Sequence, residues 1–218
     1  MNPTMRRFPW MAGVGLLLLI MALSLVFLLA KARSAAEHRE SLPVYAQVAD
    51  FSLTNQNGAA VSLADLRGRV WIADIIFTRC PGPCLRMTRQ MKELQDALPK
   101  DAPTKLVSLT TDPDYDTPAV LKLYGERAGA DTNRWTFFTG TKLQIASLAT
   151  GSLKLSAVEK KLDERASPDD LWVHSTIFVI VDKRAQLRGV YQTGGEDVDW
   201  TVEKQKILDA AKQLEREP

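Results

Sequence analysis

The stretch Val70-Trp71-Ile72-Ala73-Asp74-Ile75-Ile76-Phe77, continued by Thr78-Arg79-Cys80-Pro81-Gly82-Pro83-Cys84-Leu85, decides the fold of this chain. Its first half is almost continuously apolar and rich in β-branched and aromatic residues, which is typical of a strand buried on both faces. Beyond the second half, apolar residues recur at helical spacing, at Met87, Met91, Leu94 and Leu98. The stretch therefore predicts a central strand that turns into an amphipathic helix, with both cysteines of the chain in the turn.

Further strands and helices alternate around this stretch. Asn57-Gly58 supplies the tight turn of a predicted β-hairpin between Phe51–Thr54 and Val61–Leu63. Strands are predicted over 104–110, 135–138, 172–181 and 185–191, and helices begin after the cap residues Thr117 and Asp199 or Thr201. Residues 151–170 have a weak pattern and are predicted to form a loop or an inserted helix. This alternation predicts an α/β fold, a mixed sheet with helices on both faces.

The N-terminal part of the chain differs from the rest. Met11 to Ala30 contains no charged side chain, and about 20 residues of helix can span a hydrocarbon core roughly 30 Å thick. The alternative is a cleaved secretory signal ending near Ala30-Lys31-Ala32, but its apolar core would exceed the usual ~7–15 residues. We therefore predict a short segment over 1–10, a single transmembrane helix over 11–30, a polar tether over 31–44 and a globular domain over 45–218.

Charge and cysteine count exclude two classes of protein. The chain has 28 Lys and Arg against 26 Asp and Glu and no basic run with interleaved aromatic residues, so nucleic acid is not a predicted partner. Two cysteines are too few for a disulfide-stapled scaffold, and a domain of this size does not need one. The proximity of Cys80 and Cys84 therefore indicates either chemistry or one local bridge.

Cys80 and Cys84 have the i, i+4 spacing that faces one side of a helix, so the sulfurs converge if the turn winds into the first helical turn. Pro81 and Pro83 suit first-turn positions, where no backbone donor is lost. A helix N-terminus favours the thiolate and lowers the thiol pKa, and Arg79 and Arg86 add to this effect if they point inward. The alternative is a structural disulfide or two inert buried thiols, although so small a loop gains little from a bridge.

His174 is the only histidine of the predicted globular domain, because His38 falls in the tether and is predicted to be exposed without a role. Strand ends at one edge of such a sheet lie close together, so His174 is a candidate third ligand beside the cysteines. A histidine satisfied in the core or at the surface is the alternative. Two thiolates and an imidazole suit Cu(I) and accept Cu(II) with an added ligand, whereas structural zinc usually takes four ligands.

Several other side chains near the turn have ordinary interpretations. Met87 and Met91 share the spacing of the apolar helix face, which predicts core packing and not thioether ligation. Asp112 and Asp116 are either polar groups beside the site or turn and cap residues. Asp74 interrupts a buried strand, where an unpartnered carboxylate is costly, so we expect it to be partnered or at a sheet edge.

The cysteine turn, the segment Thr111-Asp112-Pro113-Asp114-Tyr115-Asp116-Thr117-Pro118, and His174-Ser175 ahead of a strand ending in Asp182 together resemble the Sco/SenC family. The resemblance covers roughly Gln47 to Leu214. It implies a thioredoxin-like fold and copper, Cu(I) or Cu(II), bound by Cys80, Cys84 and His174. It further implies a role in assembling the binuclear copper centre of cytochrome c oxidase.

The leading hypothesis is therefore a copper metallochaperone and not an enzyme in its main role. It would sit in the cytoplasmic membrane through a single pass, face the periplasm, and deliver copper to the oxidase subunit that binds it or to another copper protein. The alternative hypothesis is a thiol:disulfide oxidoreductase in which Cys80 attacks a substrate disulfide and Cys84 resolves the intermediate. A redox or copper sensor is a third possibility with no sequence feature in its favour.

Overall fold

The structure, a computed structural model, describes residues 8–37, 41–165 and 172–218. The chain forms two compact units, Met1–Ser41 and Leu42–Pro218. The first contains one helix, α1 (Phe8–Glu37), so the beginning of the predicted polar tether is helical. Within the described ranges, no helix combines the length and apolar character needed to cross a membrane. The structure thus does not support the transmembrane span predicted over residues 11–30.

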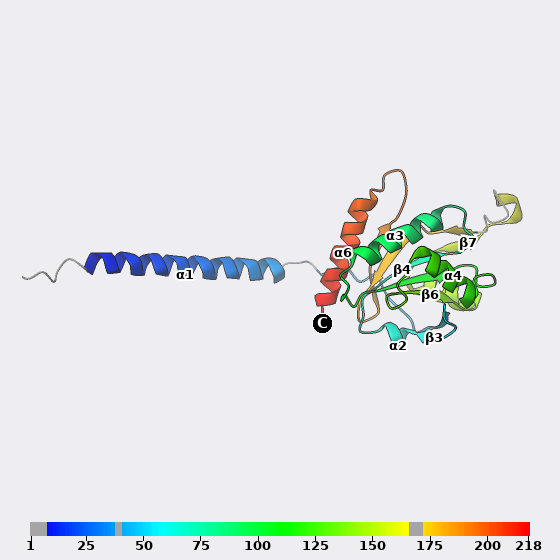
Figure 1. Cartoon of the computed structure of the whole chain (residues 1–218), viewed down its shortest axis with the longest axis horizontal. Helices are drawn as coiled ribbons and strands as arrows, with labels where there is room; N and C mark the ends of the chain where they lie inside the picture. The colour runs from blue at the N-terminus through cyan, green and yellow to red at the C-terminus, as the bar shows by residue number, and fades with distance from the viewer. Residues whose placement is uncertain (1–7, 38–40, 166–171) are drawn as a thin grey trace, which may run out of the picture. The chain divides into compact units, whose positions relative to one another are not determined.

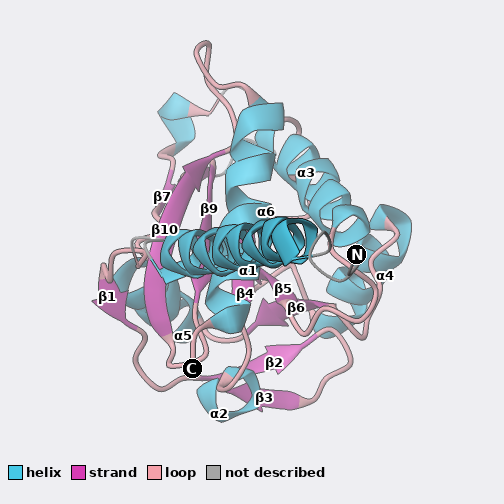
Figure 2. Ribbon diagram, turned by 90° about the vertical axis from the view of Figure 1, so that its left-hand side faces the viewer, coloured by secondary structure: helices cyan, strands magenta, loops and turns pink. Residues whose placement is uncertain are grey.

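The second unit is built on one eight-stranded mixed sheet (Figure 2). Its strands are β1 (Ala46–Gln47), β2 (Ser52–Asn55), β3 (Ala60–Ser62), β4 (Trp71–Ile76), β5 (Lys105–Thr110), β6 (Trp135–Thr139), β9 (Ile177–Val181) and β10 (Gln186–Gln192). They lie in the order β1-β10-β9-β4-β5-β6-β2-β3. β4, β5 and β6 are parallel, β9 pairs antiparallel with β4, and β10 pairs antiparallel with β9. β4 is therefore a central strand, as its sequence predicts.

Helices cover both faces of this sheet (Figure 1). Ile72 and Ile76 of β4 pack in one apolar core with residues of α3 (Pro83–Ala97), α4 (Pro118–Ala128) and α6 (Trp200–Arg216). Trp71, Ala73 and Ile75 pack in the other core, with residues of α2 (Leu63–Leu66), α5 (Lys142–Ala146) and the π-helix Ser147–Ser152. The predicted thioredoxin-like α/β architecture is confirmed.

The predicted hairpin turn and the two predicted helix caps are confirmed. β2 and β3 form the predicted hairpin, and Gly58 has the positive φ of 79° that the turn requires. Thr117 caps α4 by accepting a hydrogen bond from the Val120 N–H, and Asp199 caps α6. The pairing of β2 with β6, which places the hairpin within the main sheet, has no local signal and was not predicted.

The predicted strand 172–181 is wrong in one respect, because it is two strands. β8 (Trp172–His174) pairs with β7 (Ala157–Glu159) in a separate two-stranded sheet, and β9 begins only at Ile177. The change of partner has a visible cause, since the Ser175 N–H donates to the Ser156 carbonyl (2.8 Å) before the chain enters the main sheet. The segment 151–170, predicted to form a loop or an inserted helix, contains the strand β7 and a short 3₁₀ helix at Leu162–Glu164.

One buried ion cluster joins the two ends of the domain to β10. The Arg188 side chain is 6% exposed, and its Nη1 donates to Asp182 Oδ2 (2.7 Å) and Glu217 Oε2 (2.8 Å). Its Nη2 also donates to the Leu42 carbonyl (2.7 Å). Arg188 thus links the first residues of the domain with its C-terminal end.

Arg188→Met is expected to lower the free energy of unfolding of the domain by roughly 3–5 kcal/mol, because it leaves the Asp182 carboxylate buried without its cation. Urea denaturation of the full chain, followed by circular dichroism, measures the loss. Arg67→Met is the matched control, since Arg67 and Asp50 form an exposed pair (3.6 Å) worth less than about 1 kcal/mol. Equal losses in the two variants would contradict the assignment of a stabilising cluster to Arg188.

Candidate functional site

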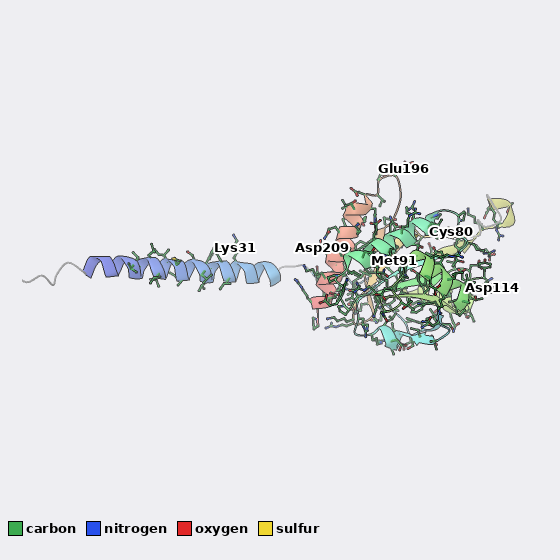
Figure 3. All side chains as sticks on the ribbon, viewed as in Figure 1. Lys31, Cys80, Met91, Asp114, Glu196 and Asp209 are labelled. Atoms are coloured by element: carbon green, nitrogen blue, oxygen red, sulfur yellow. The ribbon has the colours of Figure 1, made fainter. Side chains whose placement is uncertain are left out.

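The cysteine turn follows β4 directly. The Cys80 N–H donates to the Phe77 carbonyl (3.2 Å), which closes a tight turn over residues 77–80. Gly82 is the residue before α3, and the helix begins with Pro83 in its first position. Cys80 therefore lies outside the helix and only Cys84 lies in its first turn. The two cysteines were predicted to lie on one face of a helix, and they do not. Instead, the turn places Cys80 near the start of α3 (Figure 3).

Cys80 and Cys84 are not joined by a disulfide, and their side chains share a hydrogen bond. Cys80 is 6% exposed and Cys84 is 1% exposed, and both belong to the apolar core that lies under α3. The Phe77 backbone N–H donates to Cys84 Sγ at 3.5 Å. The two sulfurs thus form a compact dithiol at the carboxyl end of the central strand, shielded from bulk water.

Burial raises the pKa of the Cys84 thiol well above its usual value. The hydrogen bond with Cys80 and the negative charge of Asp74 act in the same direction, while the Phe77 N–H opposes them. The lower pKa predicted from the helix N-terminus is therefore wrong for Cys84, because loss of hydration outweighs the helix end. Asp74 itself is fully buried in β4, between β9 and β5, so of the two predicted alternatives, a partnered carboxylate or a sheet-edge position, the sheet edge is excluded.

The loop after β5 holds the first half of the turn. Asp116 is fully buried, and its carboxylate accepts hydrogen bonds from the Thr78 N–H (3.1 Å) and from the hydroxyls of Thr78 and Thr110. Burial raises the pKa of Asp116, and these hydrogen bonds partly offset that effect. Asp116 is thus bound to the residue two positions before Cys80.

Arg79 is directed to the same loop. Its Nη2 donates to Asp112 Oδ2 at 2.6 Å, and its guanidinium lies 4.1 Å from the centre of the Tyr115 ring. Asp112 and Asp116 are therefore polar groups beside the cysteine turn, and the cap of α4 is Thr117 and not Asp116. The sequence analysis missed Thr78 and Thr110. Thr110 ends β5 and Thr78 follows the end of the adjacent parallel strand β4 by two residues, so their signal was a threonine near the end of each strand.

The structure brings together two of the three predicted ligands. His174 ends β8, where its backbone is opposite Ala157, and its side chain lies outside the described residues. Among the side chains that are described, no group of three or more Cys, His, Asp and Glu residues could hold a metal ion. His174 as a third ligand therefore stays a prediction. Met87 and Met91 are fully buried in the core, which confirms their packing role.

A dithiol in the turn between the central strand of a mixed sheet and a helix defines the class of thioredoxin-like dithiol proteins. The SCO1/SenC family model matches residues 40–208, which is most of the chain, and the chain belongs to this family. The chain is also similar to an SCO1 protein homolog of Bacillus subtilis (strain 168), with 31% identity over 172 residues, 76% of this chain and 86% of that protein.

Two solved structures are similar in fold. BsSco, described as a member of the Sco family of cytochrome c oxidase assembly proteins with a disulfide switch, is 27% identical. The match has a TM-score of 0.61 and covers 80% of this chain and 99% of that one. Arabidopsis thaliana ScoI with copper bound is 19% identical, with a TM-score of 0.61 and coverage of 77% and 99%, and shows the fold alone.

The unequal burial of the two thiols predicts unequal alkylation. Iodoacetamide at neutral pH is expected to label Cys80 at least about tenfold faster than Cys84, because Cys84 is 1% exposed and its pKa is raised. Peptide mass spectrometry after short exposure of the reduced full chain measures both rates. The same labelling in concentrated urea is the control and should abolish the difference. Similar rates in the native protein would show that the turn opens readily.

Proposed function

We propose that this protein is a copper metallochaperone that carries copper on Cys80, Cys84 and His174 and helps to assemble the binuclear copper centre of cytochrome c oxidase. The observation that supports this most is the pair of hydrogen-bonded thiols at the end of the central strand. The family assignment supports it as well, since BsSco, which has a known structure, is described as a member of the Sco family of cytochrome c oxidase assembly proteins.

The donor set suits copper as cargo. Thiolate is a soft ligand, and two thiolates with one imidazole leave a low-coordinate site of the kind that Cu(I) prefers and that Cu(II) enters with an added ligand. Both thiols must lose a proton when copper binds, so copper binding by the buried dithiol releases two protons. Cys80 is the more exposed of the two residues, at 6% against 1%, so transfer to an acceptor begins there.

Copper binding by the reduced full chain is expected to depend on all three ligands. Cys80→Ser, Cys84→Ser and His174→Ala should each weaken binding by more than the roughly 10–100-fold that loss of an outer partner costs. Competitive titration with a Cu(I) chelator, and the thiolate-to-Cu(II) absorption, measure the effect. His38→Ala is the matched control, because it removes the other histidine of the chain and should change nothing. Unchanged binding in His174→Ala would remove that residue from the site.

A second function, thiol:disulfide oxidoreductase, is supported by one observation. The two thiols share a hydrogen bond, so they are close enough to be oxidised to a disulfide with little movement of the chain. In this role Cys80 attacks and Cys84 resolves. The copper titration variants separate the two functions, because reductase activity on a disulfide substrate would survive His174→Ala and be lost in both cysteine variants.

We further propose that the N-terminal helix attaches the domain to the cytoplasmic membrane and leaves it on the periplasmic side. Support comes from the side chains of α1 between Leu16 and Leu29, which are all exposed and, apart from Ser24, all apolar. An apolar surface of this kind is stabilised by contact with lipid.

The full chain is therefore expected in the membrane fraction after a carbonate wash. A double substitution, Leu18→Glu with Leu25→Glu, should move it to the soluble fraction, because each charge costs roughly 2.5–3.5 kcal/mol in a bilayer. Leu143→Glu is the control, since Leu143 is 80% exposed on the domain. A wild-type chain found in the soluble fraction would contradict the attachment.

A further inference from the structure

The turn that carries Cys80 is held from outside by one loop. In the turn over residues 77–80, Thr78 and Arg79 occupy the two central positions, and Cys80 is the fourth residue. Both central residues are bound by the loop that follows β5, Thr78 by Asp116 and Arg79 by Asp112. The position of Cys80 therefore depends on a segment more than thirty residues away along the chain.

Asp116 makes the more complete of the two attachments. It is fully buried, and its carboxylate receives three hydrogen bonds, two from Thr78 and one from the Thr110 hydroxyl. Thr110 Oγ1 in turn accepts from the Asp112 N–H (3.0 Å), and the Asp116 N–H donates to the Asp112 carbonyl (2.8 Å). The loop is thus closed on itself, and it presents a rigid acceptor to Thr78.

The two sulfurs have different supports. Cys84 lies in the first turn of α3 and receives the Phe77 N–H, so the helix and β4 hold it. Cys80 precedes the helix, separated from it by exposed Pro81 and Gly82. The orientation of the turn over residues 77–80 therefore decides how Cys80 lies relative to Cys84, and Asp116 fixes that orientation through both donors of Thr78.

We propose that Asp116 is a positioning residue for the dithiol, one that holds Cys80 beside Cys84 through Thr78. As far as copper is concerned, this inference rests on the proposed function; for the thiols it stands by itself. Holding two reacting groups together raises their effective concentration. The hydrogen bonds between Asp116 and Thr78 therefore favour both closure of a Cys80–Cys84 disulfide and chelation of a soft metal by both sulfurs.

The test is the equilibrium of the full chain with glutathione. Glutathione disulfide oxidises the dithiol: the Cys80–Cys84 S–S bond forms, the glutathione S–S bond breaks, and two electrons and two protons pass to two glutathione thiols. Asp116→Asn, which cannot accept all three hydrogen bonds, should lower this equilibrium constant at least roughly fivefold, which corresponds to a potential about 20 mV more positive. Thr78→Val, which keeps the shape and charge but loses the hydroxyl donor, should shift it in the same direction.

Asp114→Asn is the matched control, because Asp114 lies in the same loop but is 74% exposed and bound to Lys142. It removes the same charge and should leave the equilibrium constant within about twofold of the wild-type value. Urea denaturation of each reduced variant separates stability from positioning. A folded Asp116→Asn protein with lower stability and an unchanged equilibrium constant would overturn the proposal.

If Asp116→Asn does not fold, Thr78→Val decides in the same way. A shifted equilibrium constant with glutathione supports the positioning role of Asp116, and an unshifted one rejects it. The thiol equilibrium is measured without copper, so it is independent of the proposed function. A wild-type protein that binds no copper would refute the metallochaperone while the Asp116 variants still gave their own result. In a protein that does bind copper, Asp116→Asn should also change the thiolate-to-Cu(II) absorption, and Asp114→Asn should not.

Discussion

The burial of β4 on both faces is the constraint from which the position of the site follows. All six of its residues are buried, so helices must cover both sides of the sheet, and α3 must return over the strand that precedes it. The reversal from strand to helix is made by the cysteine turn. Cys80 and Cys84 are consequently placed at the carboxyl end of the central strand and in contact with the apolar core, whatever their chemistry. Their low exposure is a result of the architecture and not a separate feature of the site.

The parts of the fold that could be predicted are those with local signals. The helical spacing of Met87, Met91 and Leu94 predicts α3, because one face of the helix must be apolar. Thr117 and Pro118 predict the start of α4, because Thr117 accepts a hydrogen bond from a first-turn N–H and Pro118 has no N–H to leave without a partner. The separation of β8 from β9 could not be predicted, since it depends on a hydrogen bond between Ser175 and Ser156, which are distant in the sequence. For that reason the sequence predicts that His174 is near the edge of the sheet but not which strand it joins.

The candidate site shows the same limit at the level of single residues. Asp112 and Asp116 have the composition of an ordinary turn ahead of a helix, and from the sequence alone that interpretation is as good as a role beside the cysteines. What separates the two is the contact between Asp116 and Thr78, across 38 residues, and that of Asp112 with Arg79. Adjacent parallel strands make these contacts possible, because β4 and β5 end at the same edge in the register Ile76 opposite Thr110. A pairing register has to be known before such contacts can be inferred.

Burial also bears on which of the two proposed functions is the main one. A catalytic dithiol reacts as a thiolate, and enzymes lower the pKa of the sulfur to obtain it. Here burial raises the pKa of Cys84, and the charge of Asp74 adds to the effect, so both favour the thiol form of this sulfur over the thiolate. A soft metal changes that balance, because its positive charge replaces the two protons and favours the deprotonated sulfurs. A buried Cys84 that favours the thiol form until a cation binds is better suited to carrying copper than to exchanging disulfides.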